Sequence, residues 1–152
     1  MIIFRVDDRL VHGQVVEGWL GTFNIKGLVI ANDEVFKDEA IKSIMRFSTP
    51  KSVELIFSQV SLLKEVSFNP DENYMVLFRS LEDVIKAIEN GVKIDRLNLG
   101  GIHYAKGRNF SFGRALFLSE EEKKILNKII SMGVEIYMQA IPQEKMVKLE
   151  NL

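Results

Sequence analysis

The feature that most limits how this chain can fold is a series of short apolar runs separated by longer amphipathic segments. The runs are rich in Val, Ile, Leu, Phe and Tyr and are bounded by turn residues, as β-strands are. They cover residues 2–6, 27–31, 53–57, 74–78, 96–99, 115–118 and 135–138. Several are apolar at consecutive positions, for example from Met75 to Phe78, which indicates strands covered on both faces.

The segments between the runs carry recognisable helix boundaries. Asn32 or Asp33 can cap a helix that continues to residue 47, and residues 59–66 and 143–149 are weaker helix candidates. Two further helices begin with capping-box spacing and end at glycine: Ser80 with Asp83 and then Gly91, and Ser119 with Glu122 and then Gly133. This alternation predicts an α/β chain: a single-domain, open, mostly parallel twisted sheet of about six to seven strands, with helices on both faces.

Composition excludes several classes of function. The 152 residues fit one domain, and a net charge of -1 provides no broad basic face for nucleic acid. The absence of cysteine excludes disulfides and thiolate metal sites. No apolar run approaches the roughly 18 residues that cross a bilayer, and a strand beginning at residue 2 leaves no room for a signal peptide. We therefore expect a cytoplasmic protein.

A polar segment, residues 7–14, separates the first strand from the first expected helix. His12 then lies at the carboxyl end of a strand and at the amino end of a helix, where unpaired N–H groups and a partial positive charge favour an anion. Arg9 can bind two phosphate oxygens with its planar guanidinium. We expect His12 to carry a phosphoryl group, Arg9 to stabilise its charge, and the backbone amides of Gly13 and Gln14 to bind it.

Simpler interpretations of this segment stay open. His12 can merely end the strand, and Arg9 can be a surface arginine paired with Asp7 or Asp8. Either carboxylate, with Asp8 as the named candidate, can instead orient the ring or the guanidinium. A divalent metal site at the two acids is disfavoured because arginines flank them, so we expect no metal and no cofactor.

The longest irregular stretch, residues 100–114, is rich in glycine and carries His103, Lys106 and Arg108. Loops of this length in compact domains usually bind ligands or move. Because ligands of open α/β sheets bind beyond the carboxyl ends of the strands, this loop and the His12 segment are expected at the same crevice. We interpret it as a possible substrate or partner loop; a mobile surface loop is the alternative.

Residues 7–15, from Asp7 to Val15, resemble the phosphorylation segment of the IIB components of mannose/fructose/sorbose-type sugar phosphotransferase systems. Residues 32–35, 91–94 and 97–101 are also similar to that family, and the resemblance covers the whole chain. One departure is Ile102, where the family pattern leads us to expect methionine.

The resemblance implies a single IIB domain over residues 1–152. It implies that His12 accepts a phosphoryl group on Nδ1 from the phospho-IIA subunit or domain and passes it to a sugar brought by the membrane components IIC and IID. It also implies that Arg9 steadies the group in transit, that the protein forms a homodimer, and that it associates peripherally with the membrane through IIC and IID.

Two other classes of function are weighed against this one. A non-enzymatic α/β module could bind phosphate or a phosphosugar at the same strand end without forming a covalent bond. A metal-dependent phosphatase could use Asp7 or Asp8.

Overall fold

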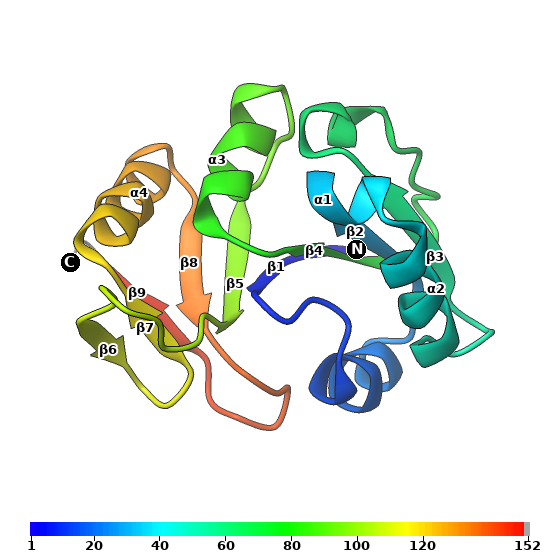
Figure 1. Cartoon of the computed structure of the whole chain (residues 1–152), viewed down its shortest axis with the longest axis horizontal. Helices are drawn as coiled ribbons and strands as arrows, with labels where there is room; N and C mark the ends of the chain where they lie inside the picture. The colour runs from blue at the N-terminus through cyan, green and yellow to red at the C-terminus, as the bar shows by residue number, and fades with distance from the viewer. Residues whose placement is uncertain (151–152) are drawn as a thin grey trace.

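The computed structural model describes residues 1–150, and its centre is a seven-stranded sheet with the order β3-β2-β4-β1-β5-β8-β9 (Figure 1). The first six strands in that order run parallel, and β9 pairs antiparallel with β8 at the edge. The strands are β1 (Ile2–Asp7), β2 (Ile25–Ala31), β3 (Glu54–Ser58), β4 (Asn73–Phe78), β5 (Arg96–Gly101), β8 (Glu135–Met138) and β9 (Val147–Leu149). The predicted mostly parallel α/β sheet is confirmed.

Helices cover both faces of this sheet, and each face has its own hydrophobic core. The helices are η1 (Gln14–Leu20, of π type), α1 (Asp33–Lys37), α2 (Glu39–Ser48), η2 (Val60–Glu65, a 3₁₀ helix), α3 (Leu81–Glu89) and α4 (Glu120–Ser131). In β4, Val76 and Phe78 join the core under η2, α3 and α4, whereas Met75 and Leu77 join the core under η1, α1 and α2. This alternation explains why the strand is apolar at every position from Tyr74 to Phe78.

The predicted helix from residue 32 or 33 to residue 47 is two helices. Asn32 caps α1 by accepting a hydrogen bond from the Val35 amide at 2.9 Å. The chain then breaks at Asp38, whose extended backbone and side chain cap α2 through the Ile41 amide at 3.1 Å. Aspartate competes with the helical backbone in this way, so a second cap replaces a continuous helix.

Two other predicted elements are placed differently. The predicted strand 115–118 is β7 (Leu116–Leu118), which lies outside the main sheet and pairs antiparallel with β6 (Phe110–Phe112) from the expected irregular loop. The predicted helix at 143–149 is wrong, because its last three residues form β9, in which Leu149 pairs with Ile136 of β8. Backbone pairing with an otherwise open sheet edge outweighs a weak local helix preference here.

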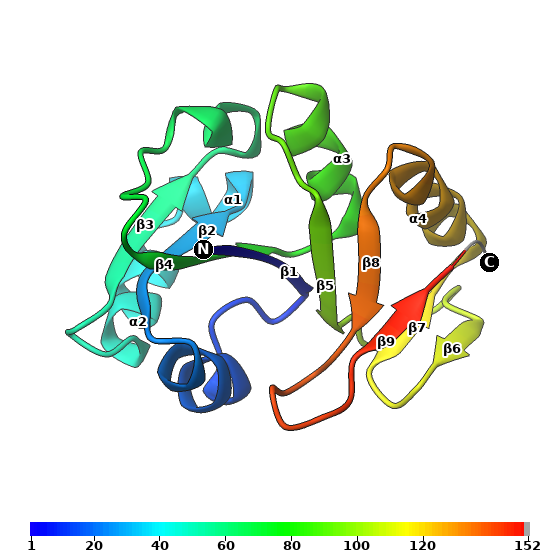
Figure 2. The same ribbon diagram turned by 180° about the vertical axis from the view of Figure 1, so that it is seen from behind.

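The carboxyl ends of β1, β5 and β8 reach the same edge of the sheet in both views (Figures 1 and 2). The segments that leave these three strands therefore lie near one another, and this edge holds the candidate site. Within residues 1–150, no helix is long and apolar enough to cross a bilayer.

Candidate phosphoryl-transfer site

The turn after β1 sets the positions of Arg9 and His12. The Leu10 amide donates to the Asp7 carbonyl at 2.9 Å, and Leu10 has a φ of 56°, a left-handed conformation that is uncommon for a residue with a branched side chain. The Leu10 side chain is fully buried in the core beside η1, which offsets the local strain. The His12 carbonyl then accepts the first helical hydrogen bond, from the Val16 amide at 3.0 Å.

The His12 ring is held by one nitrogen and leaves the other available. Its Nε2 lies 2.8 Å from Asp7 Oδ2, and 12% of its side chain is exposed. Asp7 carboxylate fixes the proton on Nε2, so the lone pair is on Nδ1. Nδ1 has no hydrogen-bond partner among residues 1–150 and is not one of the fully buried polar atoms, so it keeps contact with solvent. The ring is more enclosed than a freely exposed histidine, and only Nδ1 is positioned to act as a nucleophile.

Asp7 is kept ionised by the groups around it. Burial raises the pKa of its carboxyl, but the hydrogen bond from His12 and the charge of Arg5 outweigh this effect, and the pKa lies below its ordinary value. Arg5 Nη2 donates to Asp7 Oδ2 at 3.1 Å, and both side chains are fully buried. The negative charge that orients His12 is therefore itself fixed by a buried counter-charge.

Arg5 is held from several strands. Burial lowers the pKa of its guanidinium, but the ordinary pKa of arginine is so high that the group remains charged at neutral pH. Its Nη1 donates to Asn98 Oδ1 at 2.5 Å and to the Gln139 carbonyl at 3.0 Å, and its Nη2 donates to the Ala140 carbonyl at 2.9 Å. The guanidinium lies 4.8 Å from the Trp19 ring centroid. These contacts connect β1, β5 and the segment after β8 with helix η1.

Arg9 lies on the other side of the same carboxylate. Its amide donates to Asp7 Oδ1 at 3.2 Å, its Nε is 3.6 Å from that oxygen, and its Nη2 donates to Gln14 Oε1 at 3.0 Å. Its side chain is 43% exposed, so the guanidinium is steadied yet open to a ligand. The amides of Gly13 and Gln14 come before the first helical hydrogen bond, so the helix itself offers them no acceptor. A Cβ on Gly13 would meet no atom within 4 Å, so the space beside this residue is open.

The expectation that Asp8 orients His12 needs correction, because Asp7 is the residue that contacts the ring. Asp8 turns to the loop after β5, where its Oδ1 lies 2.5 Å from His103 Nδ1. The structure thus brings His103 and Arg108 to the site, since Arg108 Nη1 is 3.8 Å from Asp8 Oδ2. Lys106 is exposed on the same loop. Each carboxylate is engaged by a histidine and an arginine, which disfavours the alternative of a metal ion bound between them.

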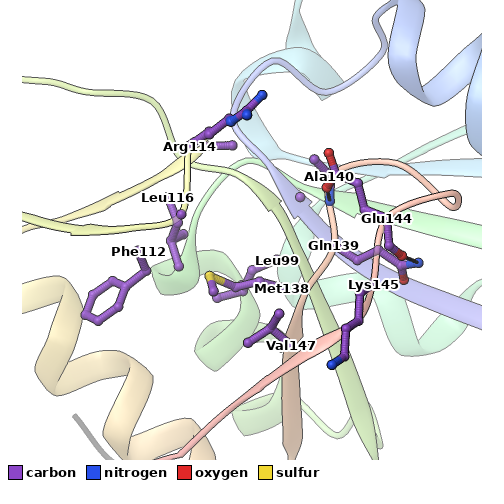
Figure 3. Close-up of a pocket in the computed structure, with 13 residues that line it drawn as sticks. Leu99, Phe112, Arg114, Leu116, Met138, Gln139, Ala140, Glu144, Lys145 and Val147 are labelled. Atoms are coloured by element: carbon purple, nitrogen blue, oxygen red, sulfur yellow. Dashed lines mark hydrogen bonds between the residues drawn. The ribbon is translucent and has the colours of Figure 1, made fainter.

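A separate cavity of about 250 Å³ lies beyond the ends of β5 and β8, beneath the β6–β7 hairpin (Figure 3). Its lining is partly apolar, with Leu99, Phe112, Leu116, Met138 and Val147, and it does not include His12 or Arg9. It borders the histidine site only through Gly100 and residues 139–140, which also contact Arg5.

Comparison with known proteins decides the family. The family model for the sorbose-subfamily IIB component of the phosphotransferase system (PTS) matches residues 1–152. The chain belongs to this family. IIB components of the PTS are phosphotransferases, and the chain accordingly has a phosphocarrier role in sugar transport.

Individual relatives support the same family for this IIB component. The sorbose-specific EIIB component of Klebsiella pneumoniae is 31% identical over 150 residues, which are 95% of this chain and 90% of that protein. The mannose-specific EIIAB component of Escherichia coli (strain K12) is 29% identical, and this chain spans 46% of its length. The crystal structure of the IIBSor domain of the sorbose permease from Klebsiella pneumoniae has a TM-score of 0.85 at 29% identity, covering 96% of this chain and 91% of that one. The crystal structure of manxB from Thermoanaerobacter tengcongensis has a TM-score of 0.86 at 31% identity, covering 97% and 92%.

The sequence interpretation of this IIB component missed Arg5 as a member of the site. The sequence did contain a signal, because Arg5 interrupts a strand that is otherwise apolar. In a strand covered on both faces, a charged side chain is buried and requires a partner. Its carbonyl partners at residues 139 and 140 carried no such signal, since backbone groups are common to all residues.

Proposed function

We propose that His12 carries the phosphoryl group of this IIB component on Nδ1, receiving it from phospho-IIA and passing it to a sugar held by IIC and IID. The single observation that supports this assignment is the contact between His12 Nε2 and Asp7, which leaves the lone pair on Nδ1. The same contact keeps the ring from rotating, so the nucleophile is oriented before the donor arrives.

In each step of the proposed transfer one bond to phosphorus forms while another breaks, so no cofactor is needed. The lone pair of His12 Nδ1 forms a bond to phosphorus while the N–P bond of the donor phosphohistidine breaks, and the donor nitrogen keeps that electron pair. In the second step a sugar hydroxyl attacks phosphorus, the N–P bond to His12 breaks, and the hydroxyl proton is released. Throughout both steps the proton remains on His12 Nε2 and is donated in the hydrogen bond to Asp7.

Charge stabilisation in both steps comes from Arg9 and the start of the helix. Phosphoryl transfer spreads negative charge over three oxygens, so catalysis consists mainly of positioning and neutralisation. Arg9 is tied to Asp7 and Gln14 while 43% of its side chain stays exposed. The open space at Gly13 lets the donor's phosphoryl group approach the neighbouring amides.

The test uses phospho-IIA as donor and follows the intact mass of this chain. We expect a gain of one phosphoryl group that is lost in acid and survives alkali, as a phosphoramidate does, and that is absent in His12→Ala. Arg9→Ala should keep the fold and slow transfer by about 10²- to 10³-fold. Wild-type transfer in Arg9→Ala would remove the electrostatic role of Arg9.

Two alternative functions give different outcomes in the same assay. A non-enzymatic phosphate- or phosphosugar-binding module would bind the ligand reversibly with no change in covalent mass. A metal-dependent phosphatase would release inorganic phosphate in a reaction that a chelator stops. The further proposals of a homodimer and of membrane association through IIC and IID are tested by sedimentation equilibrium and by co-purification with those components.

A further inference from the structure

A second histidine stands at the same strand edge and is held by the neighbouring carboxylate. His103 Nδ1 lies 2.5 Å from Asp8 Oδ1, and the His103 amide donates to Asp8 Oδ2 at 2.7 Å. The His103 side chain is 47% exposed. The two rings are bound in opposite senses, because His12 uses Nε2 for its carboxylate and leaves Nδ1, whereas His103 uses Nδ1 and leaves Nε2.

Gly101 shows that His103 lies beside the carboxylate that holds His12. A Cβ on Gly101 would lie 3.4 Å from His103 Cε1 and 3.6 Å from Asp7 Oδ1, so these two atoms flank a single point. Asp7 is the carboxylate that holds His12. His103 therefore approaches the group that orients the phosphoryl carrier, and the backbone of Gly101 separates them without a side chain.

The position of His103 is braced from helix α4. Arg108 binds Glu122 through two hydrogen bonds, from Nε at 2.9 Å and from Nη2 at 3.1 Å. Its remaining Nη1 donates to the His103 carbonyl at 2.6 Å. Glu122 is a buried residue that also completes the capping box of α4. The loop thus holds His103 in one geometry, which reduces the ordering cost when a ligand contacts its ring.

We propose that His103 is a catalytic residue of this transfer, which donates a hydrogen bond from Nε2 to an oxygen of the phosphoryl group in transit on His12. This inference rests on the proposed function of His12. The proposed role requires an imidazolium ring, which donates from Nδ1 to the Asp8 carboxylate and from Nε2 to the phosphoryl oxygen and so adds its positive charge to that of Arg9. Two cationic groups then neutralise the phosphoryl oxygens, rather than Arg9 alone.

The experiment measures the rate of phosphoryl transfer from phospho-IIA to the full chain by rapid quench. His103→Ala should slow transfer by about 10- to 100-fold, the effect of a lost charge-assisted hydrogen bond. His103→Gln keeps a neutral donor and should recover part of that loss. Arg114→Ala is the matched control, because it removes an exposed charge from the end of the same loop, and among residues 1–150 no hydrogen bond or ion pair joins Arg114 to Asp8. It should transfer at the wild-type rate.

The tether to Asp8 gives a second readout. Asp8→Asn should slow transfer about as much as His103→Ala, and the double variant should be no slower than either, because both changes remove the same interaction. Additive losses would show that Asp8 does not act through His103 and would overturn the proposal. The unfolding free energy of each variant is measured in urea, and the comparison of His103→Gln with wild type decides the case if His103→Ala does not fold.

The remaining outcomes separate the two proposals. A wild-type rate in His103→Ala, with His12 still labelled, overturns the role of His103 and leaves the function of His12 intact. Equal slowing by Arg114→Ala overturns it too, because the net charge of the loop would then account for the effect. Absence of label on His12 in the wild-type chain instead overturns the proposed function itself.

Discussion

Replacing Asp7 with asparagine removes the negative charge at the centre of the site and preserves the size of the side chain. Arg5 and Asp7 are both fully buried, so the substitution leaves a buried guanidinium without its counter-charge, which costs about 3–5 kcal/mol. The contacts of Arg5 with Asn98 and with two carbonyls remain, so we expect a loss at the lower end, about 3 kcal/mol. The melting temperature should fall by about 6–12 °C.

Urea denaturation at neutral pH measures this loss, and Asp8→Asn is the matched control one residue away. The Asp8 side chain is 20% exposed and pairs with exposed or partly exposed groups, so its neutralisation should cost about 0–1 kcal/mol. Equal losses in the two variants, or a loss below about 1 kcal/mol for Asp7→Asn, would refute the assignment of Asp7 as the counter-charge of Arg5.

The same substitution should weaken the hold on His12 without changing its tautomer. Arg5 Nη2 and His12 Nε2 both contact Asp7 Oδ2, so the asparagine oxygen takes that place and accepts from both groups. The asparagine NH₂ group takes the place of Oδ1 and faces the Arg9 amide, which is also a donor, so that contact is lost. The charge-assisted hold on the ring is lost as well, and transfer should slow by about 10- to 100-fold. ¹⁵N NMR of the ring reports the tautomer, and transfer at the wild-type rate would contradict this reasoning.

Three further predictions concern the stability of the fold. Gly100→Ala places a methyl group against the fixed Arg5 guanidinium and should lower the unfolding free energy by about 1–3 kcal/mol. The control is Gly21→Ala, which lies in open space on a helical backbone and should leave the unfolding free energy unchanged or raise it by up to about 1 kcal/mol. Equal effects of the two substitutions in urea would contradict the steric clash between residue 100 and Arg5. Folding lowers the pKa of Asp7, so the carboxylate contributes its full stabilisation above about pH 4 and loses it as the pH falls through the folded pKa. The difference in unfolding free energy between wild type and Asp7→Asn should therefore shrink below about pH 4 in urea titrations. A difference that stays constant with pH would argue against a lowered pKa of Asp7. Ser119→Ala removes the cap of α4 and should cost about 1 kcal/mol, so an unchanged urea midpoint would exclude a stabilising cap.

Local patterns predicted the central part of the fold well. The six parallel strands were found because consecutive apolar residues reflect burial on both faces, as the two cores around β4 show. The helix ends at Gly91 and Gly133 were also predicted correctly, and these glycines adopt φ values of 97° and 90° that other residues rarely take. β9 and the β6–β7 hairpin were not predicted in these roles, because their pairing depends on which edges the rest of the fold leaves free.

The site was predictable where it is local in sequence. Arg9 and His12 belong to one turn, so a short motif was sufficient to place them together. The choice between Asp7 and Asp8 was not available, because it depends on the loop after β5, which draws Asp8 to His103 across 95 positions of the chain. The buried partners of Arg5 come from β5 and from the segment after β8 and required the assembled sheet.

Trp19, the single tryptophan of the chain, gives this site an optical signal of its own. Its indole is almost completely buried, stacks against the Arg5 guanidinium and donates from Nε1 to the Ala140 carbonyl at 2.9 Å. Any event that shifts Arg5 alters the surroundings of this chromophore. Fluorescence emission from the unlabelled protein can therefore report such a shift in real time.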